Sequence, residues 1–178
     1  MQYFVRGLFF GGATTGLLLM LPAVLLQTVV PLPALTAALA LATVLFLAIE
    51  SGLLPFRMPQ NARLVPSDIV VRTDGSGALQ FGFEMGTGLR TFVPSHLPYA
   101  AIAVLLFGGP WWATPLGGLA FAFGRSLMVR SAVHSGDASA WDRAFAARRT
   151  RILALCWTVA LLAGALAVAL QHGGWTLF

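Results

Sequence analysis

The uncharged apolar segment near the start of the sequence restricts the fold more than any other feature. Residues 7–30 contain no charged side chain, and at about 1.5 Å of rise per residue a helix of this length crosses the ~30 Å hydrocarbon core of a bilayer. Only 10% of the 178 residues are charged and the mean hydropathy is +0.82, whereas soluble domains carry about 25% charged residues. We therefore expect an all-α protein that is embedded in the lipid bilayer.

The rest of the chain repeats this pattern of apolar segments divided by turns and polar stretches. We predict one integral membrane domain over residues 1–178, a polytopic helical bundle of five crossings with one helix broken near Pro94 and Pro98. The predicted crossings are residues 7–30, 34–54, 78–107, 116–130 and 152–170, and the polar loops are residues 55–77 and 131–151.

The arginines predict how these crossings are oriented. All eleven basic residues are arginines, and they fall at Arg6, in 57–90 and in 125–151. If the turns at 31–33 and 108–115 face outward, the arginine-rich segments at Arg6, 57–72 and 125–151 share one side. The positive-inside rule makes that side cytoplasmic. We expect a protein of a bacterial plasma membrane with a cytoplasmic N-terminus. A four-crossing arrangement would separate the two arginine-rich loops.

The segment 69–83 has two interpretations. Asp74-Gly75-Ser76-Gly77 is a strong turn signal. Residues 69–73 and 78–83 could therefore pair as a short β-hairpin around that turn. Alternatively, Ala78 begins a helix that continues toward residue 107. The sequence leaves both interpretations open.

Residues that could carry chemistry gather in the segment 81–98. We predict that Glu84, Arg90, Ser95 and His96 line a substrate path, with Pro94 and Pro98 breaking the helix. Glu84 and Arg90 are six residues apart and cannot pair on one helix, so each needs a partner elsewhere, such as Glu50 or Arg125, or a water-filled cavity. The alternative is an interfacial segment in which the charged side chains reach water and His96 caps the break.

Glycines predict where helices pack closely. Gly12 and Gly16 are four residues apart, as are Gly82 and Gly86. This small-xxx-small spacing allows helix backbones to approach one another in a membrane.

Several classes of function are excluded by residue content. His96, His134 and His172 are scattered, and Cys156 is the single cysteine, so neither a metal site nor a disulfide is expected. No catalytic triad, phosphate-binding loop or dinucleotide motif is present. We expect no enzymatic activity, no cofactor and no metal. Because the arginines serve membrane orientation, we expect no nucleic-acid partner either.

One segment resembles a known family. Residues 81–106, with Pro94-Ser95-His96-Leu97-Pro98, are similar to the broken helices of the CcdA/DsbD-like thiol-disulfide membrane transporters of cytochrome c biogenesis. In that family a glycine-rich helix runs into a Pro-Cys-x-x-Pro break whose cysteine carries electrons. Ser95 stands at the place of that cysteine, and Cys156 cannot form a dithiol pair alone. The resemblance implies a helical scaffold with a kinked helix beside a central cavity, without the redox function.

A looser resemblance covers most of the chain. The proline-rich run 53–66 and Phe123-Gly124-Arg125 resemble multi-pass membrane proteins of high-GC bacteria, which implies no activity. Two functions stay open: a transporter-like protein, in dimeric form, that moves a small solute or ion past the broken helix, and a non-catalytic accessory subunit that binds another membrane protein through the glycine faces at 7–16 and 82–88.

Overall fold

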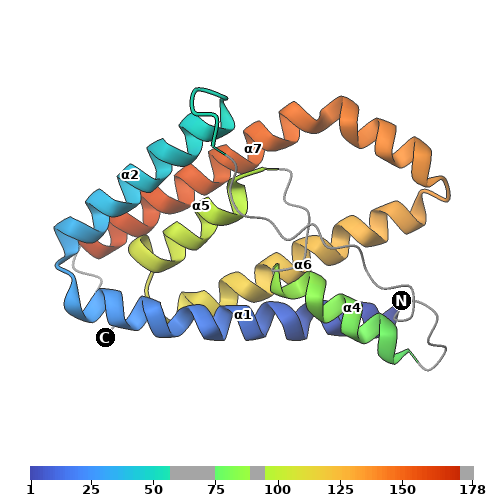
Figure 1. Ribbon diagram of the computed structural model, residues 1–178, viewed down its shortest axis with the longest axis horizontal. Coiled ribbons are helices and arrows are strands. Elements are labelled where there is room, and N and C mark those ends of the chain that lie inside the picture. Colours follow the sequence, from blue (N-terminus) through green and yellow to red (C-terminus); the bar gives the residue numbers. More distant parts are fainter. Residues whose placement is uncertain (57–74, 89–94, 173–178) are drawn as a thin grey trace. The chain divides into compact units, whose positions relative to one another are not determined.

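The computed structural model describes residues 1–56, 75–88 and 95–172, and this part of the chain contains helices and no strand. The predicted all-α class is confirmed. The helices, shown in Figure 1, are α1 (Gln2–Val29), α2 (Leu32–Glu50), α4 (Ser76–Thr87), α5 (Leu97–Ala103), the π-helical turn η1 (Val104–Gly108), α6 (Ala113–His134) and α7 (Ala138–His172).

The described residues contain fewer candidate membrane spans than the five crossings predicted. Three helices in these ranges are long and apolar enough to span a membrane: α1, α2 and the Ser139–Leu170 part of α7. The predicted crossing 78–107 is divided, because α4 ends after 12 residues at Gly88, whose φ is 72°. The second piece, Leu97–Gly108, is a shorter apolar helix that reaches only about 18 Å at 1.5 Å per residue. The predicted crossing 116–130 lies in α6, which contains Arg125 and Arg130 and is not among the three.

Of the two interpretations of residues 69–83, the described half agrees with the helix and not with the hairpin. Residues 76–83, which include its second strand, belong to helix α4, while residues 69–74 lie outside the described residues. The predicted polar loop 131–151 is also largely helical. It turns at residues 135–137, where Gly136 has φ 69° and the Asp137 carboxylate accepts backbone hydrogen bonds from Ser139 (2.9 Å) and Ala140 (3.0 Å). This contact starts α7 as an N-cap does.

The chain forms two compact units, which are described separately. Unit 1 comprises Met1–Leu18, Gln60–Phe92 and Pro115–Arg149, and unit 2 comprises Leu19–Pro59, Val93–Thr114 and Thr150–Phe178. Helices α1, α6 and α7 contribute to both units.

In unit 1, α1, α4 and α6 meet through glycines. A Cβ built on Gly82 would collide with the carbonyl oxygen of Phe4, and one on Gly86 with the carbonyl oxygen of Leu8. Gly12 and Gly118 form an equivalent contact between α1 and α6. Because these neighbours are backbone atoms, a side chain at such a position cannot be accommodated by a rotamer change. The helices therefore pack backbone against backbone, as small-xxx-small faces do in membranes.

In unit 2, α2 runs antiparallel to α5 and η1. Three contacts define the register: Glu50 with His96, Phe46 stacked on Tyr99 with ring centroids 6.3 Å apart, and Leu39 against Gly108. Helix α7 packs on the same pair, where Ala167 lies near Gly108 and Gly164 near Val104. Figure 1 shows α2, α5 and α7 side by side.

A polar side chain from α1 stabilises the end of η1. The Gln27 amide donates hydrogen bonds to the carbonyl oxygens of Leu106 (3.3 Å) and Gly109 (2.8 Å). A π-helical turn leaves carbonyl groups without their usual α-helical donors. In an apolar environment such groups need another partner, and Gln27 provides it.

Candidate functional site: a carboxylate at the helix break

The candidate site lies where α2 ends and α5 begins. Glu50 is the last residue of α2 and the only charged residue of that 19-residue helix. Ser95 and His96 precede α5, whose first residues include Pro98. Proline at this position suits a helix start, because its missing N–H would have no intrahelical acceptor there. The antiparallel register of α2 and α5 therefore brings a carboxylate to the break.

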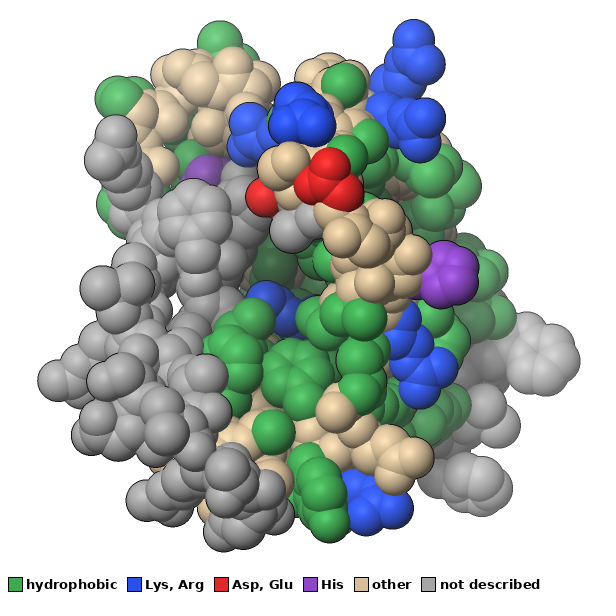
Figure 2. All heavy atoms as spheres, turned by 90° about the vertical axis from the view of Figure 1, so that its right-hand side faces the viewer, with side chains coloured by type: hydrophobic (Ala, Val, Ile, Leu, Met, Phe, Trp, Pro, Cys, Tyr) green, Lys and Arg blue, Asp and Glu red, His purple; other side chains and the backbone are tan. Residues whose placement is uncertain are grey.

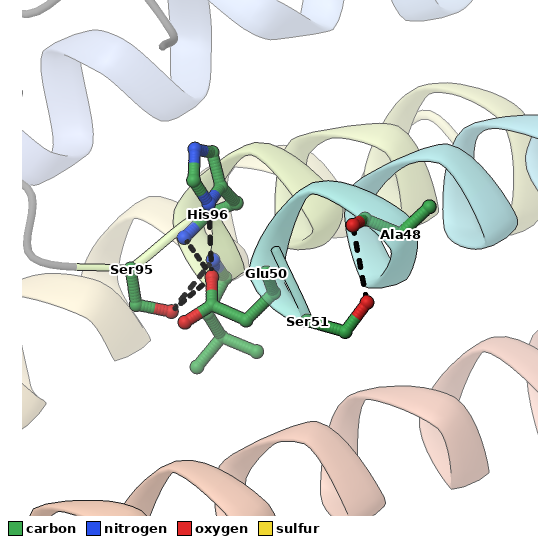
Figure 3. A network of polar contacts seen from close by, with 6 residues as sticks. Ala48, Glu50, Ser51, Ser95 and His96 are labelled. Carbon is green, nitrogen blue, oxygen red and sulfur yellow. Dashed lines mark hydrogen bonds and ion pairs between the residues drawn. The ribbon is translucent and has the colours of Figure 1, made fainter. Parts of the chain in front are cut away.

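One oxygen atom of Glu50 accepts hydrogen bonds from the His96 backbone N–H and the Ser95 hydroxyl and also contacts the His96 ring (Figure 3). Oε2 lies 2.7 Å from the backbone nitrogen of His96, 2.9 Å from His96 Nδ1 and 3.2 Å from Ser95 Oγ. Ser95 Oγ in turn accepts a hydrogen bond from the backbone N–H of Leu97 at 3.2 Å. We refer to Glu50, Ser95 and His96 as the Glu50 cluster.

The Glu50 cluster is largely enclosed. The exposed fractions are 19% for the Glu50 side chain, 23% for the His96 side chain and 7% for Ser95. Hydrogen bonds to a carboxylate are about twice as strong as neutral ones, and removal of the carboxylate would leave partly buried donors unpaired. The carboxylate thus both holds the start of α5 and contacts a titratable imidazole, which a simple cap does not require.

Charged residue types are rare in the described part of unit 2, to which this cluster belongs. Among the described residues of unit 2, Glu50 and Arg151 are the only Asp, Glu, Lys or Arg. The described part of unit 1 contains nine, which are Arg6, Glu84, Arg125, Arg130, Asp137, Asp142, Arg143, Arg148 and Arg149. Figure 2 shows arginine side chains in blue at several places around a hydrophobic area in green.

The residues predicted for a substrate path do not all meet. Ser95 and His96 come together with Glu50. Glu84 belongs to α4 in unit 1, where Gln80 Nε2 lies 3.5 Å from its carboxylate. Arg125, one of the partners expected for Glu84 or Arg90, also lies in unit 1, with its guanidinium carbon 5.5 Å from the ring centroid of Phe121. Arg90 and Pro94 lie outside the described residues.

From the sequence, Glu50 is predicted only as a possible partner for Glu84 or Arg90. The signal that could have identified it was a lone acidic residue at the end of the apolar run 34–54, because an ionisable side chain in such a place is expensive and needs a partner. Its actual partners are 45 and 46 residues further along the chain.

No group of three or more His, Cys, Asp or Glu side chains among the described residues could hold a metal ion. Glu50 and His96 supply a carboxylate and an imidazole, a pair that can pass a proton between them. Comparison with protein-family models, with curated proteins and with solved structures finds no match to this chain.

Proposed function

We propose that this chain is a small transport protein of the bacterial plasma membrane, with its N-terminus in the cytoplasm, that moves a proton or a proton-coupled solute past the break before α5. Glu50 and His96 are the proton-exchanging pair, and Ser95 orients the carboxylate. The observation that carries the proposal is the 2.9 Å contact between His96 Nδ1 and Glu50 Oε2, in a unit whose described residues include one other charged residue type, Arg151.

Ionisable side chains in an apolar environment require free energy, so their presence calls for a functional reason. A carboxylate and an imidazole in an apolar helical unit are expensive, and such groups in membrane proteins mark ion pathways and proton relays. Discontinuous helices near them are a common feature of transporters. With three candidate spans in the described residues, one chain is small for a complete path, so we propose a homodimer as the transporting form.

A flux measurement tests the proposal. The purified protein is reconstituted in liposomes that contain a pH-sensitive dye, and a potassium gradient with valinomycin drives protons inward. We expect proton uptake with the wild type, and about a tenfold or larger reduction with Glu50→Gln or His96→Ala, since each removes one member of the pair.

Ser51→Ala is the matched control. Ser51 follows Glu50 directly, and its hydroxyl donates to the carbonyl oxygen of Ala48 in α2 at 3.1 Å (Figure 3). This variant should transport like the wild type. Equal flux in wild-type and Glu50→Gln liposomes, or no flux above empty liposomes in any of them, would overturn the proposal.

The accessory-subunit alternative relied on the glycine faces at 7–16 and 82–88. Gly12, Gly82 and Gly86 contact other helices of the same chain, so a partner protein would have to use a different surface. This geometry favours the transport proposal.

A further inference from the structure

Unit 1 contains a cationic pocket at the end of α6. Its volume is about 680 Å³. It is lined by the residue before α1 and by four residues from the last two turns of α6, which are Met1, Arg130, Ser131, Val133 and His134. All five residues are exposed, so a ligand outside the protein can reach the pocket.

Two side chains of this pocket offer nitrogen donors that the protein does not use. Arg130 and His134 are four residues apart in α6, and this spacing puts them on one face of the helix. Neither side chain forms an ion pair or a hydrogen bond within the described part of the chain. The acidic residue that follows them, Asp137, is engaged at the start of α7, where its carboxylate accepts hydrogen bonds from Ser139 and Ala140. The pocket is therefore suited to a ligand that brings its own negative charge.

The neighbours of the pocket indicate where it lies when α1 is in a bilayer. Met1 directly precedes α1, a candidate membrane span whose uncharged stretch begins at Gly7. The residues ahead of such a stretch lie at the level of the lipid headgroups. Ser131 Oγ accepts a hydrogen bond from Trp141 Nε1 at 3.2 Å, and tryptophans prefer the same level. Lipid headgroups therefore have direct access to the pocket.

The chemistry of the lining narrows the ligand to an anionic lipid. A guanidinium binds phosphate oxygens through two parallel hydrogen bonds, and an imidazole N–H is a further donor. Met1 and Val133 add apolar surface beside these donors and are 56% and 63% exposed. A phospholipid combines a phosphate with an apolar part. A headgroup with a net negative charge fits an unpaired arginine better than a zwitterionic one, whose own cation competes for the phosphate.

We propose that this pocket binds the headgroup of an anionic membrane phospholipid of the phosphatidylglycerol type. The phosphate lies against Arg130 and His134, and the start of the acyl chains lies against Met1 and Val133. The site belongs to unit 1 and shares no residue with the Glu50 cluster of unit 2, so neither proposal requires the other.

A lipid competition measurement tests the site. The full chain in detergent is mixed with equimolar dioleoyl phosphatidylglycerol and dioleoyl phosphatidylcholine, and bound lipid is measured by native mass spectrometry. The wild type should retain the anionic lipid about fivefold better, which is the contribution of about one arginine near a charged headgroup. In Arg130→Gln this preference should disappear, whereas Arg130→Lys keeps the charge and should keep most of it.

Arg143→Gln is the matched control. It removes the same charge from an exposed arginine of unit 1 that does not line the pocket and whose guanidinium lies 3.2 Å from Ser139 Oγ. This variant should keep the fivefold preference. A second control adds a tenfold excess of glycerophosphoglycerol, which carries the headgroup without acyl chains and should leave the lipid bound.

Three outcomes would overturn the proposal. Equal retention of the two lipids by the wild type would show that the pocket does not select an anionic headgroup. An equal loss of preference in Arg130→Gln and Arg143→Gln would show that overall charge, and not this pocket, attracts the lipid. Displacement by glycerophosphoglycerol would show that the pocket takes a soluble phosphate compound. The first comparison uses the wild type alone, so it stands even if a variant fails to fold.

Discussion

The helices inside unit 1 and the helices inside unit 2 are held together by different kinds of contact. In unit 1, glycines allow α1, α4 and α6 to touch through their backbones, and the described charged residues are numerous. In unit 2, α2 and α5 are joined by a carboxylate, and α1 is joined to η1 by the Gln27 amide. Helices can pack backbone against backbone only where side chains are absent. A broken or π-helical backbone instead needs polar side chains that form hydrogen bonds with its unpaired N–H and C=O groups.

The largest effect is expected in the glycine-packed unit. Gly86→Leu would place a side chain against the backbone of Leu8, which cannot move without displacing α1. We expect a loss of about 3 kcal/mol or more in the free energy of unfolding, measured by denaturant titration of the detergent-solubilised protein with circular dichroism.

Gly124→Leu is the control for that prediction. Gly124 lies in α6, and a Cβ built on it meets no atom within 4 Å. Its leucine variant should unfold within about 0.5 kcal/mol of the wild type. If both leucine variants are equally stable, close backbone packing does not hold unit 1 together.

A smaller effect is expected from the amide in unit 2. Gln27→Leu keeps a side chain of similar size but removes the donors to Leu106 O and Gly109 O. We expect a loss of about 1 kcal/mol, since hydrogen bonds within membrane proteins have modest net value.

Thr28→Val provides the comparison for Gln27. The Thr28 hydroxyl donates only to carbonyl oxygens of its own helix, Val24 and Leu25, so its loss should change stability less. Unfolding of Gln27→Leu at the same denaturant concentration as Thr28→Val would show that η1 does not depend on the amide.

The smallest effect concerns the turn between α6 and α7. The backbone N–H of Ala140 and the Ser139 hydroxyl lower the pKa of Asp137 below its ordinary value. A carboxyl with a lower pKa in the folded state stabilises that state above about pH 4. The contribution is lost as the pH falls through the folded pKa.

Unfolding curves at several pH values check this sign against Asp137→Asn. The amide keeps an acceptor oxygen but does not titrate, so the wild type should lose stability relative to this variant as the pH falls below about 4. A constant difference between the two proteins from pH 6 to pH 3 would contradict the prediction.

Much of the fold class could be read from local sequence. Apolar runs without charges predict membrane helices because burial in lipid requires that composition, and α1, α2 and α7 follow this rule. The number of crossings could not be read so simply. Whether residues 78–107 form one helix or two pieces depends on Gly88, whose left-handed conformation ends α4. Glycine adopts left-handed and right-handed conformations with similar ease, so its presence in the sequence does not predict which one occurs.

Part of the candidate site could be predicted from the sequence. The Pro94–Pro98 break drew attention to Ser95 and His96, since prolines expose polar backbone groups. The choice of Glu50 as their partner depends on the antiparallel register of α2 and α5, a contact between residues 46 positions apart. Periodicity within one helix contains no information about such a pairing.

By itself, the sequence determined that this chain is helical, with apolar segments long enough to cross a membrane and a polar break in one apolar segment, because composition sets which solvent a chain can face. The tertiary structure alone decided that the glycines of α1 and α4 contact each other within the chain, that Glu50 accepts hydrogen bonds from Ser95 and His96, and that Arg130 and His134 share a pocket with Met1. These relations arise from packing between distant segments, and packing follows from the whole set of helix contacts.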